Sequence, residues 1–510
     1  MTSLANTPLE HIASSWWGRI DDGCRKAFFA TLIVNVLAFG FEMTNLTLHH
    51  DDVIHIFIQD TILGHYLGRP GFGWLHYYTQ NHYIMPFLQM TEGIVMMSVY
   101  GVLVAYFWGA RKPIDIALIA AIVCVFPYMA QVYQYNTSMA PFALAHLLAA
   151  LAVVLSTRAT FRDAAIAAIL YVATFSIYQA VVANAATIFV IWLVSRQLFG
   201  GQDEGLLSRQ TLKATIAVVG SVVAAGIIYV AAVSMMHIEF DAYQAAGDAF
   251  ELRDTANLRL AIPAIWTGTR SFFLWPESYF PDYLKTVQLV LVAAAGLFCL
   301  WVPGRLPAKI IAAALFLLAS FTPRALQLLH PEGHYHSLTV TAYAVFIAGA
   351  VMIINRAGHI ALRNASIALA SFLIAGYIIQ CNWISTVGYL NTLAHFETLT
   401  QVLARVRSIP NAAWDGKTIA VVGMYDMPND YPLKQYEAIA PRFMDAKHMD
   451  RLAHVMRDEA NFVPADQTMP KVLEYAAAHS PWPSPGSVGV VDGIGVVVFS
   501  KPPTASQPAR

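Results

Sequence analysis

Long apolar stretches separated by short polar connections dominate the first three quarters of the chain. A helix that crosses a bilayer needs about 20 mainly apolar residues, and eleven stretches meet this requirement. They cover approximately residues 27–43, 84–108, 114–132, 138–156, 163–179, 180–195, 212–235, 285–302, 307–323, 337–354 and 364–385. The apolar run from 163 to 195 is too long for one crossing, so we predict a break near Tyr178 and Gln179.

The composition supports the same fold class. Hydrophobic residues make up 57% of the 510 residues and charged residues only 12%, and the mean hydropathy is +0.52. No water-soluble core could bury that much apolar surface, so we predict a polytopic α-helical membrane protein that lies in a lipid bilayer. The net charge of −1 gives no reason to expect nucleic acid as a partner. The cysteines stand singly and predict neither a disulfide framework nor a zinc site: Cys24, Cys124, Cys299 and Cys381.

The distribution of Lys and Arg predicts the orientation, because cytoplasmic loops carry an excess of basic residues. With the N-terminal segment 1–26 in the cytoplasm, the short inside loops carry eleven basic residues. These are Arg111, Lys112, Arg158, Arg162, Arg196, Arg209, Lys213, Arg305, Lys309, Arg356 and Arg363. The longer outside loops carry six, Arg69, Arg253, Arg259, Arg270, Lys285 and Arg324. The C-terminal end is therefore predicted to lie outside.

Residues 386–510 differ from the membrane domain predicted over 27–385. They contain 23 charged residues in 125, against 40 in the preceding 385. Apolar runs broken by glycine near 417–425 and 488–499 predict strands, and 433–462 has helical spacing. We therefore predict a small α/β domain outside the membrane.

The first outside loop, approximately 44–83, carries the most chemistry. Asp51 and Asp52 stand immediately past the outer end of the first span. The next residues, about 53–66, predict an amphipathic helix in the membrane interface, and Gly68-Arg69-Pro70 and Trp74 follow. An aspartate before a helix is an ordinary N-cap, but a cap needs neither a second carboxylate nor the loop's six histidines. We therefore predict that at least one aspartate is catalytic, and we favour Asp52.

This loop resembles the serotype-converting membrane glucosyltransferase (Gtr) family of phages and Gram-negative bacteria, within the GT-C superfamily. The likeness rests on the Asp-Asp pair, the interfacial helix and Gly-Arg-Pro, and it extends to the layout: many spans, a long outside loop near 236–284 and a small external domain. The familiar motif ends in Gly-Arg-Trp, whereas Pro70 stands here and Trp74 follows. The resemblance implies an inner-membrane enzyme with a periplasmic C-terminal domain. It also implies transfer of a hexose, glucose by preference, from a polyprenyl phosphate to an envelope glycan such as lipopolysaccharide O-antigen.

Such a reaction needs a base for the acceptor hydroxyl and cations for the departing phosphate. Asp52, or else Asp51, would act as the base, and direct displacement of the phosphate would invert the anomeric centre. Arg324, at the outer end of the ninth span, is the first choice for the phosphate, and Arg270 is the second. The other predicted substrate-binding residues are Arg69, Trp74, Glu92, His334 and His336. Glu92 is included because an ionisable residue inside a span usually faces a cavity.

Several alternatives stay open. A divalent metal held by His49, His50, Asp51, Asp52 and His334 or His336 would have no fixed ligand spacing, so we expect no cofactor. A transporter or flippase would be expected to show internal repeats around a midplane site. An O-antigen ligase or polymerase would be expected to concentrate its arginines and histidines in one late loop. A membrane anchor for the tail domain would not need eleven spans.

Overall fold

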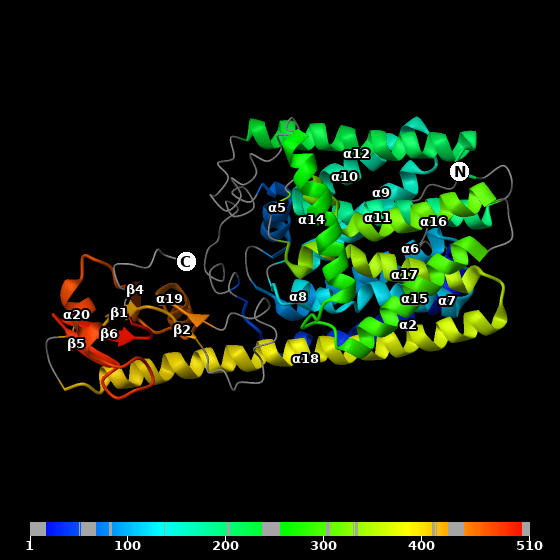
Figure 1. Cartoon of the computed structure of the whole chain (residues 1–510). Coiled ribbons are helices and arrows are strands. Elements are labelled where there is room, and N and C mark those ends of the chain that lie inside the picture. The colour runs from blue at the N-terminus through cyan, green and yellow to red at the C-terminus, as the bar shows by residue number, and fades with distance from the viewer. Residues whose placement is uncertain are drawn as a thin grey trace, which may run out of the picture.

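The computed structural model describes residues 17–49, 52, 68–80, 84–136, 138–200, 205–236, 255–301, 306–329, 331, 335–410, 414, 416–426 and 443–501. A helical bundle and a small α/β domain lie end to end, and the long helix α18 (Ile360–Arg407) runs along the bundle and into the domain (Figure 1). The chain therefore has the predicted two-part layout.

Every predicted span is covered by helix in the described residues. The helices are α2 (Asp22–Thr44), α6 (Pro86–Phe107), α7 (Pro113–Cys124), α8 (Pro127–Tyr133), α9 (Met139–Ser156), α10 (Phe161–Ile177), α11 (Val182–Phe199), α12 (Arg209–Met235), α15 (Asp282–Trp301), α16 (Leu306–Phe321), α17 (Ala342–Arg356) and α18. Among the described residues, nine helical segments are long and apolar enough to cross a membrane, or ten if the bent pair α7 and α8 counts as one span. Helix α10, with 17 residues, is shorter than these. The structure thus supports a multi-pass membrane protein, and the number of eleven crossings stays a prediction.

The predicted break in the run 163–195 is confirmed. Helix α10 ends at Ile177, Tyr178 adopts an extended backbone, and a short 3-10 helix, η2 (Gln179–Val181), leads into α11. The two helices are therefore separate elements.

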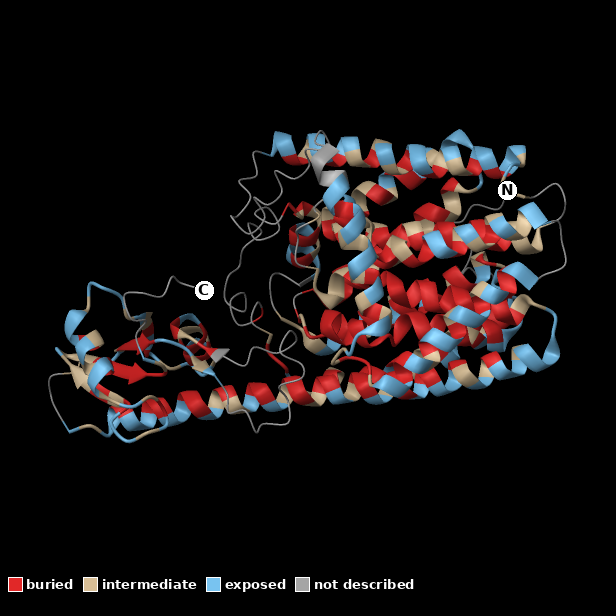
Figure 2. Cartoon of the chain, in the orientation of Figure 1, coloured by how far each residue is buried: buried red, intermediate tan, exposed pale blue. Residues whose placement is uncertain are grey.

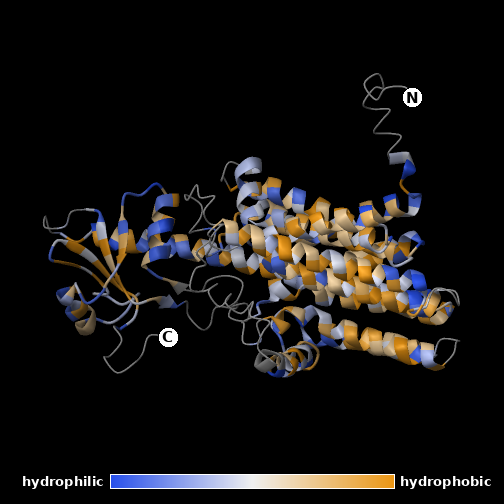
Figure 3. Cartoon of the chain, turned by 90° about the horizontal axis from the view of Figure 1, so that it is seen from above, coloured by the Kyte–Doolittle hydropathy of each residue, from blue (hydrophilic) through white to orange (hydrophobic). Residues whose placement is uncertain are grey.

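Burial places α17 at the centre of the bundle. Each residue from Ala342 to Asn355 is buried, while α12 and α18 keep one exposed face (Figure 2). Apolar residues cover the bundle surface and hydrophilic residues concentrate at its ends and on the C-terminal domain (Figure 3). This is the distribution expected where hydrocarbon takes the place of water around the helices.

The predicted outside loop 236–284 is more structured than we expected. It contains helix α14 (Thr255–Leu274), which has Pro263 in its interior and packs against the 3-10 helix η5 (Thr322–Leu328). Arg259 and Pro263 interrupt the apolar pattern of this helix in the sequence. Another helix, α5 (Pro70–Gln80), begins directly after Arg69, whereas the interfacial helix predicted at 53–66 lies outside the described residues.

The C-terminal domain is built on a four-stranded sheet of order β4-β1-β6-β5. Strand β1 (Thr418–Val422) pairs in parallel with β4 (Asn461–Pro464) and β6 (Ile494–Val498), and β5 (Val488–Val491) forms a hairpin with β6. The hairpin turn is Asp492-Gly493, with both residues at positive φ, as a two-residue turn between twisted strands requires. The other elements are α19 (Ala446–Val455), α20 (Pro470–Ala478) and the short strands β2 (Tyr425–Asp426) and β3 (Phe443–Met444). The predicted strands are confirmed. Of the residues 433–462 that were predicted to be helical, only Ala446–Val455 form a described helix, α19.

The domain boundary predicted at 386 falls within a continuous helix. Helix α18 continues without interruption to Arg407, and its last turns place Leu399, Val402 and Val406 in the core of the C-terminal domain. The same helix therefore belongs to both parts, because one buried face packs first on the bundle and then on the sheet.

Candidate active site

The short helix α8 lies at the end of the bundle nearest the C-terminal domain (Figure 1). It follows α7 after a bend of 55° at Pro127, whose ring disfavours helical geometry at Phe126. All seven of its residues are buried, although Tyr128 and Gln131 are polar. Buried polar groups need hydrogen-bond partners, so α8 links to several distant segments.

These links join four parts of the chain. Tyr128 donates to Glu277 in the connection between α14 and α15, and Gln131 accepts from Ser337 at the start of the 3-10 helix η6 (Ser337–Val340). Gln134 donates to the carbonyl of Ile384 in α18 at 3.2 Å. Asn136, just after α8, donates to Asp52.

Asp52 is completely buried, and three N–H groups converge on its Oδ2. The backbone N–H of His49 lies at 3.1 Å, the backbone N–H of Asn136 at 3.2 Å and the Asn136 side-chain Nδ2 at 2.9 Å. The bond to His49 joins two residues three positions apart in the chain. The helix that one aspartate was expected to cap lies outside the described residues, as does Asp51, so the capping role stays a prediction.

A further carboxyl group lies next to this cluster. The Asn136 side chain also donates to the carbonyl of Thr47, whose hydroxyl donates to Glu42, a buried residue near the C-terminal end of α2. The segment from 42 to 49 is held against α18 as well, because the N–H of Leu48 donates to the Thr392 hydroxyl at 3.1 Å. The end of the first span is therefore a fixed polar site rather than a solvated loop.

Arg69 lies in a separate cluster that ties helices together. Gly68 has φ +62°, and Arg69 Nε donates to Gln179 at 3.2 Å and lies over the Tyr178 ring at 4.9 Å. Gln179 donates in turn to the Gly68 carbonyl and to the Tyr229 hydroxyl. These contacts anchor the start of α5 to η2 and α12, so they give Arg69 a positioning role.

Arg324 turns into the protein. It is half-buried in η5, its Nε donates to the Tyr343 hydroxyl at 3.3 Å, and its guanidinium lies 5.9 Å from the centre of that ring. It also approaches the Gly268 carbonyl at 3.5 Å, close to the side of Gly268 where a Cβ would stand. An arginine that served only as a lipid anchor would extend outward to the headgroups, so these contacts favour an internal role.

An apolar cavity of about 470 Å³ opens beside Arg324, between α14, α15, α16 and α17. Phe273, Phe316 and Phe346 form part of its wall, and Arg270 and Thr269 lie on its α14 side. Thr269 accepts from the Tyr343 hydroxyl at 3.4 Å, the same hydroxyl that Arg324 contacts. The cationic side chains of Arg270 and Arg324 thus lie close to this apolar cavity.

Sequence reasoning missed Glu277. Its carboxyl accepts from Tyr128 and lies 3.8 Å from Lys285 Nζ. Burial raises the pKa of the Glu277 carboxyl, and the Tyr128 hydroxyl and the charges of Lys285 and Arg324 offset only part of that shift. The sequence signal was weak: a single acidic residue after Trp275-Pro276 in a loop rich in aromatic residues.

The structure describes only some of the remaining predicted residues. Glu92 lies on the exposed face of α6 and lines neither of the two larger cavities described, and its substrate-binding role stays a prediction. Trp74 is 48% exposed on α5. His336 precedes η6, where its carbonyl accepts from Thr339. His334, His50 and Asp51 lie outside the described residues. Within the described residues, no three His, Cys, Asp or Glu side chains gather as metal ligands, so the proposed ligand set stays untested.

Comparison with protein families identifies the family of the chain. Residues 40–355 match the family described as Glucosyl transferase GtrII. The chain belongs to this family. The match runs from the last residues of α2 to the end of α17, so it includes Asp52, α8, Glu277 and Arg324. A search of curated proteins found no match.

Membership in the GtrII family makes this chain a membrane-bound glycosyltransferase. Its partners are a sugar donor and a glycan acceptor. The family match leaves out α18 and the C-terminal domain.

Proposed function

We propose that the protein transfers a hexose, glucose by preference, from a polyprenyl-phosphate donor to an envelope glycan such as lipopolysaccharide O-antigen. The observation that carries this proposal is the apolar cavity between α14 and α17 with Arg270 on its wall and Arg324 beside it. A prenyl phosphate combines an apolar chain with an anion, and this cavity supplies a complementary surface for both.

The proposed chemistry is a single displacement. Asp52 accepts the proton of the acceptor hydroxyl as its oxygen attacks the anomeric carbon. The bond between that carbon and the phosphate oxygen breaks, and the electron pair leaves with the phosphate. Attack opposite the leaving group inverts the anomeric centre.

Arg324 has the properties that the leaving phosphate requires. Its guanidinium stays charged at any working pH and binds phosphate oxygens in a fork. Negative charge grows on the phosphate as the sugar departs, so a cation held there stabilises the transition state more than the ground state. The contacts with Tyr343 and Gly268 hold it in place.

The same reasoning supports an outward-facing site. Helix α8, whose neighbourhood holds Asp52 and Glu277, lies at the end of the bundle nearest the C-terminal domain (Figure 1). The basic residues in the sequence favour the opposite end as cytoplasmic. We therefore propose an inner-membrane protein with this domain in the periplasm. Because nucleotide sugars are cytoplasmic, a donor carried by a lipid is required there.

Transfer by the purified protein tests the proposal. Wild-type protein in proteoliposomes is supplied with polyprenyl-phosphate [14C]glucose and with lipopolysaccharide that carries unmodified O-antigen. Label should enter the lipopolysaccharide, and UDP-[14C]glucose should not replace the lipid donor. Absence of transfer from the lipid donor, or equal transfer from UDP-glucose, would contradict the proposed reaction.

A further inference from the structure

A second and larger cavity, of about 960 Å³, has Glu277 in its wall. One wall is the connection 276–282 before and at the start of α15, and the other is the stretch 378–386 of α18. Because a helix rises 1.5 Å per residue, this stretch lies roughly 27–39 Å from the start of α18 at Ile360. The apolar core of a bilayer is about 30 Å thick, so in the proposed orientation, with Ile360 at the inner boundary, the groove would lie near the outer boundary of the membrane.

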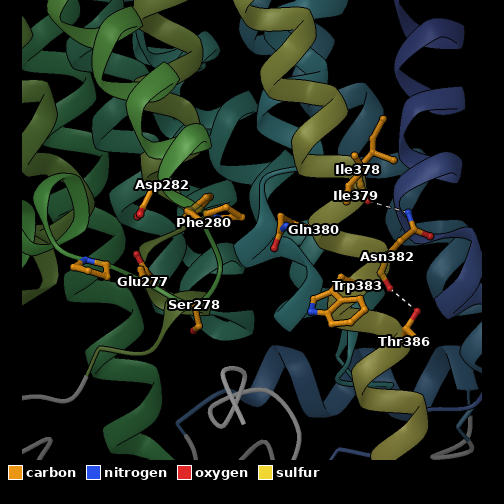
Figure 4. Close-up of a pocket in the computed structure, with 12 residues that line it drawn as sticks. Glu277, Ser278, Phe280, Asp282, Ile378, Ile379, Gln380, Asn382, Trp383 and Thr386 are labelled. Carbon is orange, nitrogen blue, oxygen red and sulfur yellow. Dashed lines mark hydrogen bonds between the residues drawn. The ribbon is translucent and has the colours of Figure 1, made fainter. Parts of the chain in front are cut away.

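The groove has side chains suited to carbohydrate. Trp383 is 41% exposed, and Figure 4 shows Trp383 and Gln380 projecting from α18 toward the segment that carries Glu277 and Ser278. An indole ring offers a broad apolar surface for the C–H face of a sugar ring. Carboxylate, amide and hydroxyl groups supply the acceptors and donors that sugar hydroxyls require.

The charged residues in the lining of the groove indicate which kind of ligand it suits. Glu277 and Asp282 are acidic, and the lining residues in the described part of the chain include neither Lys nor Arg. Lys285 lies 3.8 Å from Glu277 but is not among the lining residues, so the lining itself offers no cation to an anionic phosphate. Cationic groups instead lie beside the apolar cavity, at Arg270 and Arg324. The two cavities therefore suit two chemically different substrates.

Helix α8 connects the groove to Asp52. Its Tyr128 bonds to Glu277 in one wall of the groove, and Gln134, directly after the helix, bonds to the carbonyl of Ile384, the neighbour of the lining residue Trp383 in α18. Beyond the same helix, Asn136 bonds to Asp52. The seven residues of α8 span only about 10 Å, so a saccharide in the groove would lie close to the proposed base.

We propose that this groove binds neutral sugar residues of the acceptor glycan, with Trp383 stacked on one ring and Glu277 accepting from its hydroxyls. This inference rests on the proposed function and adds the place where the acceptor binds. The α18 wall lies outside the residues matched by the GtrII family, so the family match does not assign it.

Kinetics with the lipid donor and O-antigen acceptor test the groove. In Trp383→Ala, the KM for the acceptor should rise about tenfold, while the KM for the donor stays unchanged. Trp383→Phe should recover part of the loss because it keeps an aromatic face. Trp301→Ala is the matched control, since Trp301 is 67% exposed at the other end of α15, and it should behave as wild type. An unchanged acceptor KM in Trp383→Ala, or a rise confined to the donor KM, would overturn the inference.

A binding measurement without donor separates this inference from the proposed reaction. The probe is the O-polysaccharide released by mild acid from the same lipopolysaccharide, titrated by calorimetry into protein in nanodiscs. Wild type and Trp301→Ala should bind it, and Trp383→Ala should bind about tenfold more weakly with an unchanged melting temperature. Binding that depends on Trp383 in a protein without transferase activity would overturn the proposed function alone. Normal transfer with binding that is indifferent to Trp383 would overturn the groove alone.

Discussion

Asn136 donates two hydrogen bonds to one oxygen of Asp52, from its backbone N–H at 3.2 Å and from its side-chain Nδ2 at 2.9 Å. The two residues are 84 positions apart, and the segment after α8 brings them together. Each hydrogen bond to a charged group contributes more than one between neutral groups, so Asn136 determines where the Asp52 carboxylate lies.

Replacing this asparagine should displace the carboxylate. In Asn136→Ala we expect the free energy of unfolding to fall by about 2 kcal/mol and kcat to fall at least tenfold, with little change in the KM for the acceptor. Asn184→Ala is a matched control, because Asn184 is also buried but bonds to Thr341 between two helices. Stability and kcat measured in the same detergent should separate the variants. An equal loss of kcat in the control would argue against a specific role for Asn136.

Asp52→Asn should abolish transfer in a protein that remains folded. The amide oxygen can still accept from His49 and Asn136, so the local structure should persist, but an amide cannot take up the acceptor proton. We expect a loss of about 10²- to 10⁴-fold in turnover, measured with the lipid donor, and a smaller effect for Asp51→Asn. Near-normal turnover in both variants would show that neither aspartate is the base.

Arg324→Gln should lower turnover by about 10²-fold, because the leaving phosphate loses its cation. Arg324→Lys should recover part of the activity, since the charge remains but the fork does not. Donor binding and turnover are measured for both variants, with Arg270→Gln as the comparison. If both Arg324 variants match wild type, the phosphate site moves to Arg270.

Glu277 should make stability depend on pH. Burial raises the pKa of its carboxyl in the folded protein. Wild type should therefore lose stability relative to Glu277→Gln as pH rises from the ordinary glutamate value, about 4.3, through the raised pKa. The side-chain amide in that variant can still accept from Tyr128, so the contact with α8 remains.

Melting temperatures between pH 4 and 8 would measure this difference. Glu397→Gln serves as the control, because Glu397 is exposed on α18 and its replacement should leave the profile unchanged. Parallel profiles for wild type and Glu277→Gln would show that the carboxyl does not titrate differently on unfolding.

The orientation predicts where protease can act. Protease added outside spheroplasts should remove an epitope tag placed after the C-terminal domain, and a tag before α2 should survive until the membrane is broken. Immunoblots for both tags in the same sample provide the internal control. Protection of the C-terminal tag would reverse the orientation and every outside assignment with it.

The local pattern of the sequence determined the helices of the bundle. Apolar stretches of membrane length predicted helix at each span, because a chain in hydrocarbon must satisfy its backbone hydrogen bonds within each segment. The break at Tyr178 was also visible, since the apolar run was too long for one crossing. The strands at 418–422 and 494–498 followed from short apolar runs bounded by glycine.

Only the tertiary structure decided which polar residues meet. The sequence placed α8 inside a single span, whereas the bend at Pro127 makes it a separate buried helix that brings Asp52, Glu277 and Ile384 around one element. Glu92 had the same sequence signal as a cavity-facing carboxylate but lies on the exposed face of α6. Hydropathy along the chain depends on each residue and its near neighbours, whereas contacts between residues 52 and 136 or 128 and 277 depend on how the helices pack. For this reason the membrane fold could be predicted from local patterns, and the pairing of Glu277 with Tyr128 could not.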